Sequence, residues 1–292
     1  MFCIGVKPLN LKKVIYLNKF IPISPLMLSA DNKTHIQKIS KLKTDTIILN
    51  LEDGVGNKRL ALENCKMILR NFNRDKIKFV VRVNALDNGG VDEILEINKF
   101  NPDAIRVPKI RYIKDIEKVV DLVSDNIDIH LSIETKEAWL NLAQLKISPK
   151  ITNFYLGLLD LVADLGMNQS LIYPENATAQ YMLSHFLITT KALGVNPISF
   201  VFQDYKNRDQ FLEWLKLEKS MGYISKGVLS PTQADDVKQY LAENSDDLDR
   251  AKYIKDIFEN MSKDGINGFS DEKYGFIDEP IYKGALAILD KL

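Results

Sequence analysis

The sequence contains little cysteine and little histidine. Among 292 residues there are two cysteines, Cys3 and Cys65, and three histidines, His35, His130 and His185. Cysteines this far apart build neither a disulfide framework nor a thiolate metal site, and the histidines lack the spacing of a zinc site. A disulfide-rich secreted protein is therefore excluded, and we expect a protein of the reducing cytoplasm.

Other common signals are also absent. The formal net charge is zero, so we expect neither nucleic acid nor a membrane as a partner. Lysines interrupt the apolar residues of positions 1–22, which therefore fit neither a signal peptide nor a membrane span and are interpreted as an N-terminal arm. The chain contains no nucleophile elbow, phosphate-binding lysine loop or dinucleotide-binding glycine fingerprint.

The sequence does contain apolar β-branched runs that alternate with segments of helical period, which indicates βα units. The expected strands are Ile23–Ser29, Thr46–Leu51, Lys78–Asn84, Ala104–Pro108, Ile129–Ile133, Asn153–Leu158, Ile198–Phe202 and Gly227–Leu229. The expected helices are Asn32–Leu42 (capped by Asp31 or Ser29), Lys58–Phe72, Val91–Lys99, Ile113–Val123, Lys136–Leu145, Glu175–Leu193, Arg208–Met221 and one that begins at Pro231. Eight units within residues 1–243 predict an α/β fold of the (β/α)8 TIM barrel type.

Residues 244–292 are predicted to form a separate C-terminal helical segment. A helix is expected near Leu248–Lys263, followed by a polar loop that contains several glycines and by a last helix. Glycines in a polar loop between two helices suit a movable lid. A plain helical hairpin is the alternative, and the sequence leaves both open.

Charged side chains follow several of the apolar runs at corresponding ends. In chain order they are Glu52, Asp53, Arg82, Lys109, Glu134 and Asp160. Parallel strands that are buried on both faces are normally apolar, so charges at these ends need an explanation. The carboxyl ends of barrel strands surround the active site in TIM barrels, and we therefore expect these groups to share one site.

Glu134 and Asp160 are the predicted metal ligands. Adjacent strands would bring their carboxylates together, and Mg²⁺ typically takes one or two carboxylates while keeping several waters. Mn²⁺ is a second candidate for the same site. Such an ion can chelate a 2-oxo- or 2-hydroxy-carboxylate and stabilise an enolate at the neighbouring carbon. The alternative is that these are two unrelated surface acids.

Three further positions are predicted to assist the metal site. The planar guanidinium of Arg82 suits a carboxylate or an enolate oxygen, although a structural ion pair with Glu52 or Asp53 is the alternative. One of these two adjacent acids is expected to face the site, where it holds metal-bound water or orients Arg82. Lys109 either neutralises a substrate carboxylate or pairs with an acid at the barrel mouth.

Two aspartates have more ambiguous settings. Asp164 lies four residues after Asp160 and either caps a helix or binds metal-held water. Asp278 follows the glycine-bearing loop, so it would act as a general acid or base if that loop is a lid. The alternative for Asp278 is an N-cap just before Pro280.

In its ordered motifs the chain resembles the citrate lyase beta subunit family of the aldolase and malyl-CoA lyase superfamily. The matching segments are Leu49–Val55, Val81–Asn84, Val107–Lys109, Ile133–Thr135, Leu156–Leu161, Asp164–Gly166, Ser230–Gln233 and Phe276–Pro280. The resemblance implies a magnesium-dependent barrel lyase that breaks or forms a carbon–carbon bond beside an acyl thioester through an acyl enolate. It also implies that Glu134 and Asp160 bind the metal and that Arg82 contacts substrate oxygens. Asp278 would reach a neighbouring subunit's site, which implies a homotrimer or a hexamer.

The sequence departs from the family pattern at basic positions. The first strand lacks the family's arginine, Ser230 replaces a histidine, and Tyr173–Asn176 lacks a frequent arginine. The metal ligands are thus kept while the substrate pocket is altered. We expect a lyase for a citryl-, malyl- or citramalyl-like 3-hydroxy-acyl thioester. The alternatives are a class II-type aldolase for a free hydroxy-oxo acid and a non-catalytic metabolite-binding descendant.

Overall fold

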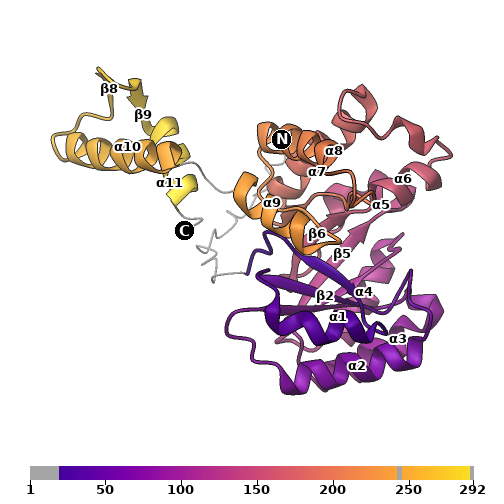
Figure 1. Ribbon diagram of the computed structural model, residues 1–292. Helices are drawn as coiled ribbons and strands as arrows, with labels where there is room; N and C mark the ends of the chain where they lie inside the picture. Colours follow the sequence, from indigo (N-terminus) through magenta and orange to yellow (C-terminus); the bar gives the residue numbers. More distant parts are fainter. Residues whose placement is uncertain (1–19, 242–244, 290–292) are drawn as a thin grey trace, which may run out of the picture. The chain divides into compact units, whose positions relative to one another are not determined.

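The computed structural model describes residues 20–241 and 245–289, which fall into two compact units divided after Leu241 (Figure 1). This division lies two residues before the expected boundary at residue 243. The predicted N-terminal arm falls almost entirely on residues 1–19, which are outside the described residues. In the part of the chain that is described, no helix is long and apolar enough to cross a membrane.

The first unit is built on a parallel sheet of seven strands whose spatial order follows the sequence. The strands are β1 (Leu26–Ser29), β2 (Thr46–Asn50), β3 (Lys78–Arg82), β4 (Ala104–Val107), β5 (Asp128–Ile133), β6 (Ile151–Leu156) and β7 (Asn196–Ile198). Sequential order with parallel pairing requires a crossover after each strand, and helices supply these crossovers. The predicted alternation of strands and helices is therefore confirmed.

The chain after β7 connects the two edges of this sheet. On one edge, Ser199 N–H donates to Ser225 O at 3.0 Å, and on the other Met27 N–H donates to Val228 O at 2.9 Å. The contacts are isolated bridges, with Lys226 paired toward β7 and Val228 toward β1. Each neighbouring strand pairs with only one residue of this segment. The predicted eighth strand therefore does not form a regular β-ladder. The sheet curls into a TIM-barrel-like arrangement.

Helices cover the outer face of the sheet (Figure 1). They are α1 (Lys33–Lys38), α2 (Lys58–Asn71), α3 (Val91–Asn98), α4 (Ile113–Leu122), α5 (Lys136–Leu140), α6 (Leu158–Asp164), α7 (Ala177–Ala192), α8 (Arg208–Met221) and α9 (Pro231–Leu241). Short 3₁₀ turns occur at Ile39–Lys41, Leu142–Gln144 and Gln169–Leu171, and a π-helical turn spans Leu86–Gly90. The helices bury their apolar faces in one large core shared with the outer face of the sheet.

The predicted cap of the first helix was wrong. Asn32 caps α1, because its Oδ1 accepts the N–H groups of Thr34 and His35 at 3.0 and 3.2 Å. The carboxylate of Asp31 instead accepts the N–H groups of Gly56 and Asn57 at 3.0 and 2.9 Å. Asp31 therefore ties the end of β1 to the loop after β2, a long-range contact that local sequence rules do not reveal.

The predicted boundaries around the sixth and seventh strands were also wrong. β6 ends at Leu156, and Leu158 already begins α6, a helix that was not predicted. Asp160 therefore lies in the first turn of a helix and does not close a strand. β7 ends at Ile198, because the chain from Ser199 onward contacts residues 225–227 through isolated bridges and single hydrogen bonds.

Side-chain alternation decides which residues face the inside of the curled sheet. A small inner cluster contains Ile48, Val80, Ala104, Tyr155 and Ile198, whereas their neighbours in sequence belong to the large core under the helices. Successive side chains of a strand point to opposite faces. The residues two positions after Val80 and Ala104 therefore face inward as well, and these are Arg82 and Arg106.

The second unit consists of α10 (Ser245–Lys263), a hairpin of β8 (Gly268–Asp271) and β9 (Gly275–Asp278), and α11 (Glu279–Leu289). Its own apolar cluster includes Ile254, Phe258 and Ile277. The predicted glycine-bearing loop is thus partly an antiparallel hairpin, with Gly275 at φ +74° in its turn. The role of this unit as a lid stays a prediction.

Candidate active site

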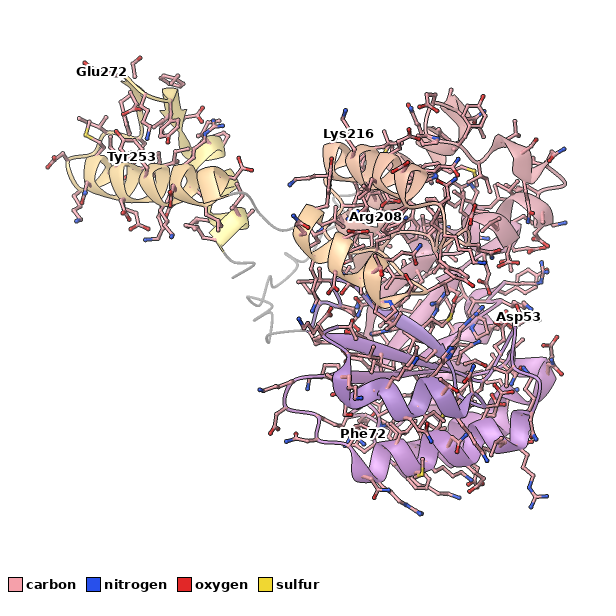
Figure 2. All side chains as sticks on the ribbon, viewed as in Figure 1. Asp53, Phe72, Arg208, Lys216, Tyr253 and Glu272 are labelled. Atoms are coloured by element: carbon pink, nitrogen blue, oxygen red, sulfur yellow. The ribbon has the colours of Figure 1, made fainter. Side chains whose placement is uncertain are left out.

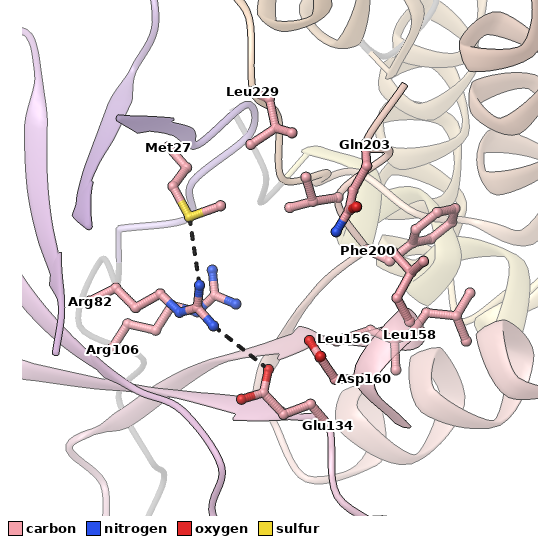
Figure 3. Close-up of a pocket in the computed structure, with 13 residues that line it drawn as sticks. Met27, Arg82, Arg106, Glu134, Leu156, Leu158, Asp160, Phe200, Gln203 and Leu229 are labelled. Carbon is pink, nitrogen blue, oxygen red and sulfur yellow. Dashed lines mark hydrogen bonds and ion pairs between the residues drawn. The ribbon is translucent and has the colours of Figure 1, made fainter. Parts of the chain in front are cut away.

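A cavity of about 100 Å³ lies at the carboxyl ends of the strands, which is room for several waters or a small organic acid (Figure 3). Its polar lining includes Arg82, Arg106, Glu134 and Asp160. Apolar side chains such as Met27 and Phe200 complete the walls. Three of the predicted site residues, with both proposed metal ligands among them, therefore line the same cavity.

Glu134 follows β5 directly and is 3% exposed. Its Oε1 accepts the backbone N–H of Lys109 at 2.8 Å, and its Oε2 lies 4.0 Å from Arg82 Nη2. Burial raises the pKa of the Glu134 carboxyl, while the charges of Arg82 and Arg106 act in the opposite direction. A cation at this position would favour the ionised carboxylate further.

Gly157 brings the chain close to Glu134. A Cβ atom at position 157 would lie 2.5 Å from the Cβ and 2.7 Å from the Oε2 of Glu134. Real Cβ contacts are never this short, so only glycine fits without displacing the carboxylate. The turn between β6 and α6 is thus built around the proposed metal ligand.

Asp160 extends from the first turn of α6 toward the same cavity (Figure 3). Within the described residues, no protein group forms a hydrogen bond or an ion pair with its carboxylate. Partial burial raises its pKa, the charges of Asp53 and Glu52 raise it further, and the Arg82 charge lowers it. Its oxygens are therefore available to a cation.

The donor set fits a magnesium ion. Mg²⁺ prefers oxygen ligands, takes one or two protein carboxylates and keeps water in its other positions. Glu134 and Asp160 supply two carboxylates from neighbouring elements. Among the described residues, no group of three or more His, Cys, Asp or Glu side chains could hold a metal ion, so water or substrate would complete the coordination.

Arg82, at the end of β3, forms an ion pair with Glu52 and also lines the cavity. The sequence left a structural and a substrate-binding role as alternatives, and the geometry allows both. Glu52 is 2% exposed and also lies 3.1 Å from Lys109 Nζ. Of the two adjacent acids, Glu52 faces the site. Asp53 lies at the surface, where its only ion pair among the described residues is a 3.5 Å contact with Lys109 (Figure 2).

Lys109 contributes through its backbone as well as its side chain. Its φ of +54° is left-handed, which is unusual and strained for a residue other than glycine. This conformation follows Pro108 and accompanies the hydrogen bond from Lys109 N–H to Glu134. The Nζ group is half-exposed and reaches Glu52, so Lys109 links the buried acids to the mouth of the cavity.

Neither Asp164 nor Asp278 is among the residues that line the cavity. The Asp164 carboxylate accepts the backbone N–H of Lys136 at 2.8 Å and pairs with Arg111 at 3.3 Å, and the first of these contacts is the main cause of its lowered pKa. It thus ties the end of α6 to the start of α5. Asp278 Oδ1 accepts the N–H of Ile281 at 3.2 Å at the start of α11. Its catalytic role stays a prediction.

Arg106 is the site residue that the sequence reasoning missed. It lies on β4, in register with Arg82 on β3, and it lines the cavity. The signal was present, because an arginine interrupts the apolar run Ala104–Pro108 just as Arg82 interrupts the run before it.

The positions that depart from the family pattern have local partners. Ser230 Oγ accepts the N–H of Gln233 at 3.2 Å and thereby caps α9. Met27 of β1 lines the cavity, with its Sδ 4.0 Å from Arg82 Nη1. The first strand therefore contributes an apolar wall to the cavity and no cation.

Comparison with known proteins identifies relatives. The family described as HpcH/HpaI aldolase/citrate lyase matches residues 24–231. A (3S)-malyl-CoA thioesterase of Cereibacter sphaeroides is 25% identical over 83% of this chain and 85% of its own length. The mitochondrial citramalyl-CoA lyase of Rattus norvegicus is 24% identical over 93% of this chain and 86% of its own length.

Solved structures share the fold. Protein CitE from Mycobacterium tuberculosis, in complex with magnesium, acetoacetate and coenzyme A, superposes with a TM-score of 0.72. The alignment covers 92% of this chain and 97% of that protein at 20% sequence identity. The resemblance that the ordered motifs indicated is thus confirmed by sequence and by fold.

Proposed function

Because the chain belongs to the HpcH/HpaI aldolase/citrate lyase family and is a carbon–carbon lyase, we propose that it cleaves 3-hydroxy-acyl thioesters with the help of Mg²⁺. The observation that carries this proposal is the meeting of Glu134, Asp160 and Arg82 in one cavity. Substrates of this class are citryl-, malyl- or citramalyl-like thioesters. The relatives named for malyl-CoA and citramalyl-CoA support the thioester over a free hydroxy-oxo acid.

The reaction breaks the bond between the carbon that carries the hydroxyl group and the carbon next to the thioester. The hydroxyl group loses its proton and becomes the carbonyl of a 2-oxo acid. The electron pair of the broken bond passes to the acyl enolate, which then takes up a proton at carbon. A divalent cation at Glu134 and Asp160 would supply Lewis-acid polarisation of the substrate oxygens.

The side chains divide the remaining tasks. Arg82 is positioned to bind substrate carboxylate or carbonyl oxygens, because its guanidinium lines the cavity and Glu52 fixes its orientation. Lys109 holds Glu134 in place through its backbone N–H. Its half-exposed ammonium group would attract an anionic substrate to the mouth of the cavity.

We assign the proton transfer at the enolate carbon to Asp278. The cavity-lining residues include no uncommitted acid besides the two proposed metal ligands. The family resemblance implies that the matching aspartate reaches into a neighbouring subunit's site, which supports this assignment. We therefore include a homotrimer or a hexamer, with the second unit acting as a lid across subunits, in this proposal.

Thioester hydrolysis is a second candidate activity, because one relative is named a (3S)-malyl-CoA thioesterase. The two reactions give different products. A lyase releases an acyl-CoA and a 2-oxo acid, whereas a thioesterase releases free coenzyme A and the intact hydroxy-acid, which is a di- or tricarboxylic acid depending on the substrate. Product analysis therefore separates them in a single incubation.

The test is to incubate the purified protein with Mg²⁺ and malyl-, citramalyl- and citryl-CoA and to identify products by mass spectrometry. We expect at least one thioester to yield acetyl-CoA and a 2-oxo acid, and chelation of the metal to stop the reaction. The Glu134→Ala variant should lose activity by about 100-fold or more, because loss of a group that only orients a metal ligand already costs about 10–100-fold. Undiminished turnover in Glu134→Ala would refute the proposed site.

A further inference from the structure

Arg106 is a buried cation that lines the cavity and forms no ion pair with an acid among the described residues. Its side chain is 5% exposed, and it lies in register with Arg82 on the neighbouring strand (Figure 3). Nε donates to Ser132 Oγ at 2.9 Å, and Cζ lies 4.0 Å from the centroid of the Tyr155 ring. Across residues 20–241, no carboxylate pairs with Arg106, and its Nη1 atom has no hydrogen-bond partner.

A buried guanidinium without a counter-charge destabilises the folded state. Burying an ionised group costs free energy unless an opposite charge and hydrogen bonds compensate for the lost hydration. Ser132 and the Tyr155 ring are neutral partners and compensate only in part. The positive charge of Arg82 on the neighbouring strand repels Arg106, whereas the charges of Glu134 and Glu52 attract it without forming an ion pair with it. The described residues therefore supply no direct counter-charge for Arg106.

The charges that line the cavity indicate what the counterpart is. The lining contains two arginines, Arg82 and Arg106, and two carboxylates, Glu134 and Asp160. A divalent cation would occupy both carboxylates. Arg82 would still be paired with Glu52, whereas Arg106 has no ion pair with a described residue. A further carboxylate of the ligand would supply the counter-charge that Arg106 lacks.

We infer that Arg106 forms a subsite for a second carboxylate of the substrate. This inference rests on the proposed function, in which the first carboxylate lies at the metal and Arg82. The hydroxyl-bearing carbon of the thioester would then carry a carboxylate and also an arm that ends in a carboxylate, and the oxo acid released is a dicarboxylate. Arg106 suits this task because two parallel N–H groups of a guanidinium bind one carboxylate. The second carboxylate is unchanged in the reaction.

A purely structural role for Arg106 predicts different behaviour. An arginine that supports the fold stabilises the ligand-free protein, so its replacement lowers the melting temperature. An arginine kept for a ligand costs stability when the ligand is absent, so a neutral replacement leaves the melting temperature equal or raises it. The two roles can therefore be separated without measuring turnover.

The binding experiment compares freshly dissolved oxaloacetate with pyruvate, which differ by one carboxylate, in calorimetric titrations of the full chain at saturating Mg²⁺. We expect the native protein to bind oxaloacetate about tenfold or more tightly than pyruvate. In Arg106→Gln the ratio should fall to within about twofold, because a bidentate charged contact is lost while pyruvate affinity is kept. Arg70→Gln, at an exposed arginine of α2, is the matched control and should keep the native ratio.

Thermal unfolding of the same variants gives the second readout. Ligand-free Arg106→Gln should melt at the same temperature as the native protein or higher, and oxaloacetate should stabilise it less. Three binding results would overturn the proposed subsite: equal affinity of the native protein for the two acids, no binding of oxaloacetate, or a kept preference in Arg106→Gln. A lower melting temperature of ligand-free Arg106→Gln would also overturn it. A kept preference without thioester cleavage would instead refute the proposed function and leave the subsite standing.

Discussion

Gly157 shows how one residue without a side chain shapes the candidate metal site. Its φ of −89° is open to any residue, so alanine meets no backbone strain there. The obstacle is the Glu134 carboxylate, which a new methyl group would displace. Gly157→Ala should therefore fold but weaken Mg²⁺ binding by about tenfold or more, as loss of ligand orientation does at other metal sites. Calorimetric titration with Mg²⁺ measures this directly.

The control for that prediction is Gly56→Ala, because a Cβ at Gly56 would meet only an ordinary contact, 3.6 Å from Asp31 Oδ2. This variant should bind Mg²⁺ as the native protein does. Native affinity in Gly157→Ala would show that Glu134 is not a ligand in the observed position.

His130 makes the interior of the barrel unit sensitive to acid. It is fully buried, Asn153 Nδ2 lies 2.7 Å from its Nε2, and burial followed by the charge of Arg106 lowers its pKa to about 3. The folded state therefore holds His130 neutral, whereas the unfolded chain takes up a proton near pH 6.5. The free energy of unfolding is therefore highest above that pH. It falls as the pH drops, by about 2 kcal/mol between pH 6.5 and 5.

Urea unfolding at several pH values tests this expectation. In His130→Gln the loss over that range should be smaller than in the native protein by about the same 2 kcal/mol. A variant at the exposed His35 serves as the control and should retain the native pH dependence. Identical pH profiles for His130→Gln and the native protein would contradict a buried neutral imidazole.

At the scale of elements, one buried ion pair secures the segment that connects the two edges of the sheet. Lys226 Nζ lies 2.7 Å from Glu218 Oε1 of α8, and both side chains have no exposed surface. Ser199 Oγ donates to the same oxygen at 2.6 Å, which links the helix to the chain after β7. Isolated β-bridges contribute little stability by themselves. We therefore infer that this side-chain network supports the closure of the sheet.

Lys226→Met should destabilise the protein by about 3–5 kcal/mol, because it leaves Glu218 buried without a counter-charge. The double variant Lys226→Met with Glu218→Gln should recover part of that loss, since no unpaired charge remains. Lys99→Met, which removes an exposed pair with Glu96, is the control and should cost less than about 1 kcal/mol. Strict additivity of the two buried substitutions in urea unfolding would rule out coupling.

At the scale of the whole molecule, the cavity and Asp278 belong to different compact units. The proposed function places Asp278 in the site of a neighbouring subunit. A mixture of Asp278→Asn and Glu134→Gln subunits should then regain activity that neither variant has alone. Random exchange of subunits in equal amounts combines an intact Glu134 with a partner's intact Asp278 in about a quarter of the sites.

The measurement is turnover before and after the two variants are exchanged through a reversible dissociation step, with mass spectrometry to verify mixed oligomers. Native protein mixed with either variant controls for losses during exchange. Verified mixed oligomers that stay inactive would place Asp278 in the site of its own chain, or outside catalysis.

The sequence by itself determined the repeating βα order, the charged ends of the strands and the family. The spacing of apolar residues is a local property of the sequence. Glu52 and Glu134 interrupt this spacing at the ends of apolar runs, so the sequence alone shows where charged groups follow the strands. The same reading was available for Arg106, which interrupts β4 as Arg82 interrupts β3. The residue pattern was therefore sufficient to predict a charged site residue on β4.

Only the tertiary structure decided how these groups meet. Asp160 lies on a helix because the chain turns at Gly157 against Glu134, and Asp31 binds the loop after β2 rather than capping its own helix. The irregular pairing of residues 225–228 likewise depends on both edges of the curled sheet. These outcomes arise from contacts between segments far apart in the chain, which local periodicity and capping rules do not contain.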